Sequence, residues 1–324
     1  MRKTELDLDI VAWLAKHEPA STDPQALADA IAEARRLSRE RNADAMACMP
    51  PSLIPASETS SEIEGPAGTL TIRVLRPAGT SAPKPTVVYF HGGGWTVGSI
   101  DSHLGHARRI CTQVDAVVVS VGYRLAPEDR FPAAFDDAVA AAEWAAQHLD
   151  ELGGTDQLVV AGDSVGGQLA ASVAIARRDA GQPLAAQLLL YPVTDVAGLY
   201  ADEAINAGFM SRRTAAKGYG LTLSDMVTFA SHYVDAADTD DWRVSPLRHA
   251  DLAGLAPAVV HTATLDVLRT EGNFYAQALE RNGVKVLARE FPTLNHSYFG
   301  LGGVSPIADA AAAQAAEDLR ALLS

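Results

Sequence analysis

Cysteine is scarce in this 324-residue chain, which contains only Cys48 and Cys111. The two residues lie far apart, and neither matches a His or Cys spacing that would bind zinc. The sequence therefore indicates neither a disulfide framework nor a zinc site. We expect both thiols to be buried as small side chains.

Basic residues are also few, since 26 Lys and Arg stand against 40 Asp and Glu, which gives a net charge of −14. This balance disfavours nucleic acids and anionic membranes as partners. Five charged side chains occupy the first ten residues, and no apolar stretch reaches the length of a signal core or membrane span. We expect a cytoplasmic protein with no nucleic-acid partner and no stable membrane insertion.

What the chain has is a series of short apolar runs, separated by helix-like segments such as 132–149 and 166–178. Such alternation predicts a mainly parallel sheet covered by helices on both faces. A hairpin around the turn 65–68 would add an antiparallel pair at one edge. The sequence thus predicts a single α/β domain over residues 1–324 with about eight strands. The expected strands are 62–64, 69–76, 86–90, 116–121, 157–161, 187–191, 258–262 and 284–291.

Two segments do not follow this alternation. Helices are expected at 5–17 and 24–43, before any strand, and residues 195–241 contain helix-compatible sequence with no clear strand. We expect residues of about 1–50 and 195–241 to form a helical cap over the carboxyl edge of the sheet. Ordinary surface helices are the alternative.

The segment Gly162-Asp163-Ser164-Val165-Gly166 directly follows the apolar run 157–161. A serine between glycines, at a turn from strand to helix, is typical of a nucleophile elbow. The motif alone is weak, but His91-Gly92-Gly93-Gly94-Trp95 follows another strand-like run upstream. The two motifs together predict nucleophilic catalysis by Ser164.

A serine nucleophile needs an imidazole base and a carboxylate that orients this base. Asp266 lies just past the predicted strand 258–262, and His296 lies in the loop that follows the strand ending at Phe291. Both would lie at the sheet edge where Ser164 emerges. The other downstream histidines are less suitable, since one lies within a strand and two lie in or after the helical segment: His261, His232 and His249.

The glycine triplet provides the remaining element, a site for the negative oxygen that forms during acyl transfer. Backbone N–H groups of Gly93, Gly94 and Val165 could bind it as an oxyanion hole. No Gly-Lys-Ser or Gly-Lys-Thr follows the triplet, which disfavours a phosphate site. His91, with His103 and His106 nearby, suggests a metal, but no ligand spacing is satisfied. We expect no metal, with His91 bracing the loop.

These motifs, together with Tyr123-Arg124-Leu125-Ala126-Pro127-Glu128, resemble those of the hormone-sensitive-lipase-like family, which includes the bacterial family IV esterases. The resemblance extends from about residue 60 to the end. It implies an α/β-hydrolase fold with a helical cap, no cofactor, and hydrolysis of short to medium acyl esters through an acyl-serine intermediate. It also implies structural roles near the site for His91, Asp163 and Glu128.

The chain departs from the family pattern at Val165, where alanine is usual, and this larger side chain should restrict the acyl groups accepted. Asp266-Val267-Leu268 lacks the usual proline, and Ser297-Tyr298 replaces the common Gly-Phe after the histidine. None of these changes removes a catalytic atom. Five side chains are candidates for lining the substrate pocket: Trp95, Phe209, Met210, Tyr219 and Tyr298.

The expected partner is therefore a small-molecule ester. Three other reactions remain open, namely acyl transfer to an alcohol, amide cleavage and elimination, since all share the triad. A non-catalytic binding relative is a further alternative, as in the plant gibberellin receptors, which this family resembles and which lack the catalytic histidine. His296 argues against it. The oligomeric state is left open between monomer and homodimer.

Overall fold

Eight strands of the chain form one sheet in the computed structural model, which describes all residues except 1–4, 17–26, 49, 51–52, 80–81 and 183. The strands are β1 (Ser57–Gly65), β2 (Gly68–Arg76), β3 (Lys84–Phe90), β4 (Val117–Gly122), β5 (Gly154–Asp163), β6 (Ala186–Leu190), β7 (Ala258–Leu265) and β8 (Val286–Asn295). Their order is β1-β2-β4-β3-β5-β6-β7-β8. β2 is antiparallel to both β1 and β4, and all other pairs are parallel. The predicted α/β-hydrolase sheet is confirmed.

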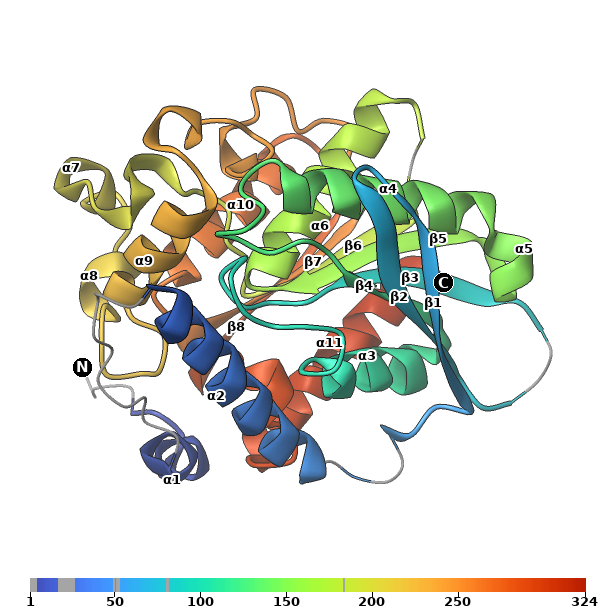
Figure 1. Ribbon diagram of the computed structural model, residues 1–324, viewed down its shortest axis with the longest axis horizontal. Helices are drawn as coiled ribbons and strands as arrows, with labels where there is room; N and C mark the ends of the chain where they lie inside the picture. The colour runs from blue at the N-terminus through green and yellow to red at the C-terminus, as the bar shows by residue number, and fades with distance from the viewer. Residues whose placement is uncertain (1–4, 17–26, 49, 51–52, 80–81, 183) are drawn as a thin grey trace.

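Helices cover both faces of this sheet (Figure 1). Successive residues of a strand point to opposite faces, so Val88 and Phe90 enter one core cluster while Val87 and Tyr89 enter the other. The first cluster contains side chains of α4 (Ala133–Gln147), α6 (Val165–Asp179) and α10 (Arg269–Arg281). The second contains side chains of α3 (Leu104–Ile110), α11 (Pro306–Leu323) and the amino-terminal helices. The short α5 (Leu149–Leu152) precedes β5.

The amino-terminal segment forms α1 (Leu8–Lys16) and α2 (Leu27–Ala47), so the second helix runs past its predicted end at residue 43. Its predicted start at residue 24 lies outside the described residues. Arg35 of α2 donates to the backbone carbonyls of Thr96 and Ala126 and to the carboxylate of Glu128. This helix is therefore fixed to two loops that follow strands of the sheet.

The second irregular segment forms α7 (Glu203–Asn206), α8 (Ser211–Thr214) and α9 (Leu223–Tyr233), and no strand occurs between residues 195 and 241. Figure 1 shows these helices at the left end of the molecule, where the parallel strands finish. Thr222 and Asp225 form a reciprocal capping box that starts α9. That α2 and these helices act together as a cap stays a prediction.

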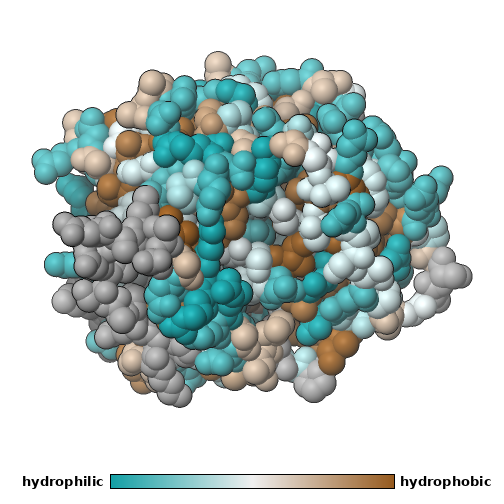
Figure 2. All heavy atoms as spheres, viewed as in Figure 1, coloured by the Kyte–Doolittle hydropathy of each residue, from teal (hydrophilic) through white to brown (hydrophobic). Residues whose placement is uncertain are grey.

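The cysteine prediction is half wrong. Cys111 is buried, but Cys48 is exposed because it follows the last residue of α2 in a surface turn. Of the helices that the structure describes, none is both long and apolar enough to cross a membrane. Hydrophilic side chains predominate on the face in Figure 2, with small hydrophobic areas between them.

Candidate active site

Ser164 lies at a sharp turn between β5 and α6, with φ of 57° and ψ of −120°. This backbone conformation is strained for a residue with a side chain, as expected for a nucleophile elbow. The glycines two positions before and after Ser164 are required for steric reasons. A Cβ atom at Gly162 would overlap the carbonyl group of Gly166, and one at Gly166 would overlap the carbonyl oxygen of Phe90. The turn therefore requires glycine at both positions.

A chain of hydrogen bonds links Ser164 to the two other residues predicted for the triad. Ser164 Oγ lies 2.9 Å from Nε2 of His296, and Nδ1 of His296 lies 2.8 Å from Oδ2 of Asp266. All three residues are buried, with exposed fractions of 6%, 8% and 2% for Ser164, His296 and Asp266. A neutral imidazole that donates from Nδ1 to Asp266 presents Nε2 as the acceptor for the serine hydroxyl.

The two partners lie at the ends of neighbouring parallel strands. β7 ends at Leu265 and β8 at Asn295, so each residue directly follows its strand. The expected ends at 262 and 291 were too early, because both strands continue past an irregularity at residues 263–265 and 291–295. The sequence nevertheless identified the correct edge. The ring of Tyr191 packs edge-on against His296 at 4.9 Å and helps to fix its orientation.

The N–H groups of Gly93, Gly94 and Val165 lie in the loop after β3 and at the start of α6. Among the described residues, no carbonyl or side chain accepts a hydrogen bond from Gly93 or Gly94. Val165 is the first residue of α6, where an N–H group has no partner in the preceding turn. φ is 122° at Gly93 and 59° at Gly94, values that favour glycine. These groups are available as donors for an anionic oxygen.

Asp163 holds the glycine loop in place through hydrogen bonds. Its Oδ1 accepts from the hydroxyl of Tyr89 at 2.5 Å and from the backbone N–H of Gly92 at 2.9 Å. His91 adds a second brace, because its Nδ1 donates to the carbonyl of Gly92 at 2.8 Å and its ring stacks on Tyr123 at 4.3 Å. Burial lowers the pKa of His91 and, with the Asp163 charge, raises that of Tyr89. Both side chains therefore act as neutral hydrogen-bonding groups.

Glu128, the third residue expected to have a structural role, lies near the surface. Its carboxylate accepts two hydrogen bonds from Arg35, which hold its pKa below the ordinary value. It thereby holds Arg35, whose Nε donates to the carbonyl of Thr96 in the loop that carries the glycines.

Two of the residues predicted to line the pocket, Trp95 and Tyr298, have fully buried side chains. The indole of Trp95 stacks on Tyr233 at 4.5 Å and donates to Gln168 at 3.0 Å, while Tyr298 packs between neighbouring aromatic rings. An aromatic residue beside a motif can serve packing, binding or both, and here both residues contribute to packing. That either residue also contacts the substrate stays a prediction.

The other three candidates lie in or beside the helical segment. The ring of Phe209 packs under the guanidinium of Arg212 at 4.0 Å, and Met210 is 56% exposed. The backbone carbonyl of Tyr219 accepts from Asn295, the residue before His296. Their role as substrate contacts stays a prediction.

Phe229 of α9 lies against Gly94, one of the oxyanion donors, and could not be identified from the sequence. A Cβ atom at Gly94 would overlap its ring. Helical periodicity assigns Phe229 to a partly buried face of α9, but it carries no information about which loop that face contacts.

A buried ion pair, which the sequence also did not reveal, fixes the helical segment to the sheet. Arg212 of α8 donates to Glu271 of α10 at 2.7 Å, and neither side chain is exposed. Burial raises the pKa of Glu271, although Arg212 opposes this change. Thr194 and Tyr200 also donate to the carboxylate of Glu271, which completes its hydrogen bonding.

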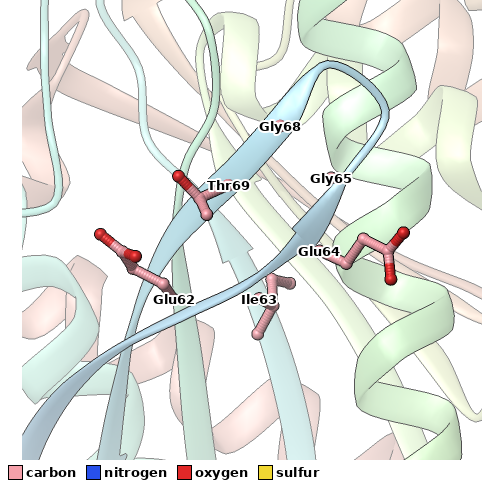
Figure 3. A pocket seen from close by; sticks show the side chains of 6 residues that line it. All are labelled: Glu62, Ile63, Glu64, Gly65, Gly68 and Thr69. Atoms are coloured by element: carbon pink, nitrogen blue, oxygen red, sulfur yellow. The ribbon is translucent and has the colours of Figure 1, made fainter.

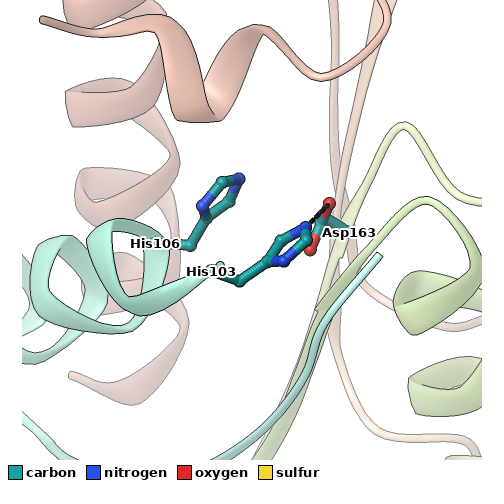
Figure 4. A group of neighbouring side chains, drawn as sticks. All are labelled: His103, His106 and Asp163. Carbon is teal, nitrogen blue, oxygen red and sulfur yellow. Dashed lines mark ion pairs between the residues drawn. The ribbon is translucent and has the colours of Figure 1, made fainter. Parts of the chain in front are cut away.

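Three further histidines are buried, and they lie in two places. His261 is buried in β7 and its Nε2 donates to Asp318 at 2.9 Å, which agrees with the expected role in packing. His103 and His106, by contrast, lie together with Asp163 (Figure 4). From the sequence these two histidines were considered together with His91 and no metal was expected, whereas the proximity of Asp163 was not predicted.

A depression at the β1–β2 hairpin is lined by residues 62–65, 68 and 69 (Figure 3). It contains two carboxylates but no nucleophile or imidazole. It therefore lacks the groups that the elbow region brings together.

Comparisons with known proteins agree with this geometry. Residues 87–300 match a family described by the alpha/beta hydrolase fold. The chain is 40% identical over 269 residues to the carboxylic ester hydrolase LipN of Mycobacterium tuberculosis, which covers 79% of this chain and 69% of LipN. It is 35% identical to an ethyl acetate hydrolase of Pseudomonas putida over 74% of this chain and 75% of that protein.

A similar solved structure is that of EstE1, a thermostable carboxylesterase cloned from a metagenomic library. It superposes with a TM-score of 0.83 at 36% sequence identity, covering 91% of this chain and 98% of EstE1.

Proposed function

The chain belongs to the α/β-hydrolase fold family, in its hormone-sensitive-lipase-like branch, and on this basis we propose that it is a serine carboxylesterase. The observation that carries the proposal is the hydrogen-bonded chain from Ser164 through His296 to Asp266, beside unpaired backbone N–H groups. Its relatives include carboxylesterases and an ethyl acetate hydrolase.

The proposed reaction starts at Ser164. Its Oγ attacks the acyl carbonyl carbon while Nε2 of His296 takes the hydroxyl proton. The carbonyl electron pair moves onto oxygen, and the N–H groups of Gly93, Gly94 and Val165 stabilise this charge. The tetrahedral intermediate then collapses: His296 returns its proton to the leaving oxygen, the alcohol departs, and an acyl-serine remains.

Water completes the cycle. His296 removes a proton from a water molecule, which attacks the acyl-serine, and the same N–H groups bind the second oxyanion. Collapse releases the carboxylic acid, while the proton on His296 returns to Oγ. Asp266 keeps the imidazole in the tautomer that accepts at Nε2 and stabilises its protonated form.

Two side chains near the oxyanion donors support a preference for short to medium acyl chains. Val165 is fully buried beside Ser164, and Phe229 covers Gly94 from the other side. Both would restrict the volume next to the reacting carbon. We further propose a cytoplasmic location, which the acidic composition supports, and a small-molecule ester as the substrate.

The experiment that tests this function compares the purified protein with its Ser164→Ala variant on chromogenic esters ranging from acetate to laurate. Hydrolysis of the shorter esters that disappears in the variant supports a serine esterase. An alcohol added as a competing acceptor distinguishes hydrolysis from acyl transfer by its product. Equal rates for both proteins, or no hydrolysis of any ester, would overturn the proposal.

A further inference from the structure

Two histidines and a carboxylate come together outside the triad (Figure 4), and the carboxylate accepts a hydrogen bond from Gly92 of the glycine loop. His103 directly precedes α3, His106 lies on α3, and Asp163 ends β5. One ligand-type atom from each residue lies within 4.8 Å of the others. The three side chains are buried, with exposed fractions of 6%, 5% and 2%. Two imidazoles and one carboxylate are a common ligand set for zinc.

The distances fit one ion after the side chains move closer together. Nε2 of His103 lies 3.7 Å from Oδ2 of Asp163, which is too long for a hydrogen bond. Two ligands of a tetrahedral zinc ion lie about 3.3 Å apart, because each bond is about 2.0–2.1 Å. The wider separations in the cluster, up to 4.8 Å, must therefore contract by up to about 1.5 Å.

The partners of each side chain leave the required atoms free. Nδ1 of His103 is bonded to Ser102 Oγ at 2.8 Å, which turns Nε2 toward Asp163. Asp163 uses Oδ1 for Tyr89 and Gly92, so that within the described part of the chain Oδ2 has only the long contact with His103. Supporting bonds of this kind orient the ligands in metal sites.

His106 supplies the independent observation. Its Nε2 is buried and has no hydrogen-bond partner among the residues that the structure describes, which is costly in a neutral packing histidine. A metal ion would satisfy a lone pair of this ring. Burial also lowers the pKa of His106 to about 3 and that of His103 well below its ordinary value. Both rings are therefore neutral near pH 7, the state in which imidazole binds a metal.

We propose that His103, His106 and Asp163 form a binding site for one divalent transition-metal ion of the zinc type. Water would complete a four-coordinate shell. The ion would not take part in ester hydrolysis, since none of its three ligands belongs to the triad. Through Oδ1 of Asp163 and the N–H of Gly92, it would instead stiffen the glycine loop.

Two nearby positive charges oppose binding. Arg41 of α2 lowers the pKa of His103, and Arg109 of α3, which is paired with Asp309, lowers that of His106. The charge of Arg41 would repel a cation. This repulsion provides a specific test, because Arg41→Gln removes the charge without altering any ligand. The variant is expected to bind the metal several-fold more tightly.

The experiment uses Co²⁺ as the probe, since a four-coordinate Co²⁺ site with nitrogen ligands absorbs strongly in visible light. Metal-free protein is titrated, and each point is held until the absorbance is constant, because a buried site fills only when the structure opens locally. Protein produced in a Co²⁺-supplemented medium provides a second route to loading. We expect one Co²⁺ per chain, displaced by Zn²⁺, and a higher melting temperature for the loaded protein.

Substitutions of the proposed ligands test whether these residues bind the ion. His106→Asn and His103→Gln are each expected to weaken binding at least about tenfold. The matched control is His249→Asn, since Nε2 of His249 lies 3.8 Å from Asp179 Oδ2 in a similar pair that has no third ligand. Circular dichroism and esterase activity check that each variant folds. No saturable Co²⁺ binding by either route would overturn the proposal. The proposal would also be overturned if Co²⁺ binding persisted in both the His103→Gln and His106→Asn variants, or if it were lost in the His249→Asn variant.

Discussion

Ser164 and His296 are 132 positions apart in the sequence, yet Oγ of one lies 2.9 Å from Nε2 of the other. The contact arises because β5 and β8 run parallel, so that both residues emerge at the same edge of the sheet. β6 and β7 lie between them, and the loop after β7 supplies Asp266. The topology of the sheet therefore positions all three groups on a rigid support.

Removal of either end of this contact should abolish most of the activity. Ser164→Ala and His296→Ala are each expected to lower kcat by about 10⁴- to 10⁶-fold, since triad residues act as a unit. The double variant should be no slower than the worse single variant. Steady-state kinetics on a short acyl ester provide the measurement. Multiplicative losses in the double variant would indicate two independent roles.

The contact between Gly94 and Phe229 gives a second prediction. Gly94→Ala places a Cβ against the Phe229 ring and strains a backbone with φ of 59°, so it should shift an oxyanion donor and lower kcat about 10²- to 10³-fold. Phe229→Ala in the same protein should restore part of this loss. Gly218→Ala is the control, because its φ of 92° is also positive but no atom lies within 4 Å of the added Cβ. A Gly94 variant no slower than the Gly218 variant would contradict the assignment of this loop.

Much of the fold and the triad could be predicted because strong local signals carry them. Alternating apolar runs determined the sheet, and the position of Asp266 and His296 after such runs determined the edge. The packing partners of Trp95 and Tyr298 could not be predicted, because an aromatic residue next to a motif gives no sign of the direction of its side chain. Phe229 and the ion pair between Arg212 and Glu271 were missed, because each depends on how distant helices pack. Tertiary contacts of this kind leave no periodic trace in the sequence.

Val165 should determine the range of acyl chains. Val165→Ala removes two methyl groups from a fully buried position beside the nucleophile, so longer acyl groups should be accepted better. We expect the ratio of kcat/KM for a long ester to that for a short ester to rise by about 10-fold or more, as for one methylene in a hydrophobic pocket. Competition between the two esters measures this ratio directly. An unchanged ratio would show that Val165 does not line the acyl pocket.

The buried pair between Arg212 and Glu271 should contribute to stability through its partners. Glu271→Gln leaves the guanidinium of Arg212 without its counter-charge in a fully buried position and should lower the free energy of unfolding by about 3–5 kcal/mol. Glu128→Gln breaks the pair with Arg35, in which the carboxylate is 59% exposed, and should cost less than about 1 kcal/mol. Urea denaturation of both variants measures the difference. Equal losses would mean that burial of the first pair has no energetic consequence.

Asp318 gives a prediction about acid stability. Burial alone would raise the pKa of this carboxyl, but hydrogen bonds from Arg289 and His261 outweigh burial and hold the pKa well below its ordinary value. The unfolded chain therefore takes up a proton on Asp318 at a higher pH than the folded protein does. This contribution to stability is complete above about pH 5 and is lost as the pH falls through about 4 and below.

Asp318→Asn removes that dependence. At neutral pH the variant should be less stable by about 1.5–3 kcal/mol, the usual range for hydrogen bonds to a charged group. Below about pH 4 its stability should approach that of the unaltered protein, because the carboxyl there has begun to bind its proton in the unfolded chain. His261 makes a separate contribution: burial lowers its pKa despite Asp318, so stability also falls with acid from about pH 6.5 downward. Thermal melts between about pH 3 and 8 distinguish the two ranges. If the difference in stability between the variant and the unaltered protein stays constant down to the lowest pH, protonation of Asp318 does not contribute to acid unfolding.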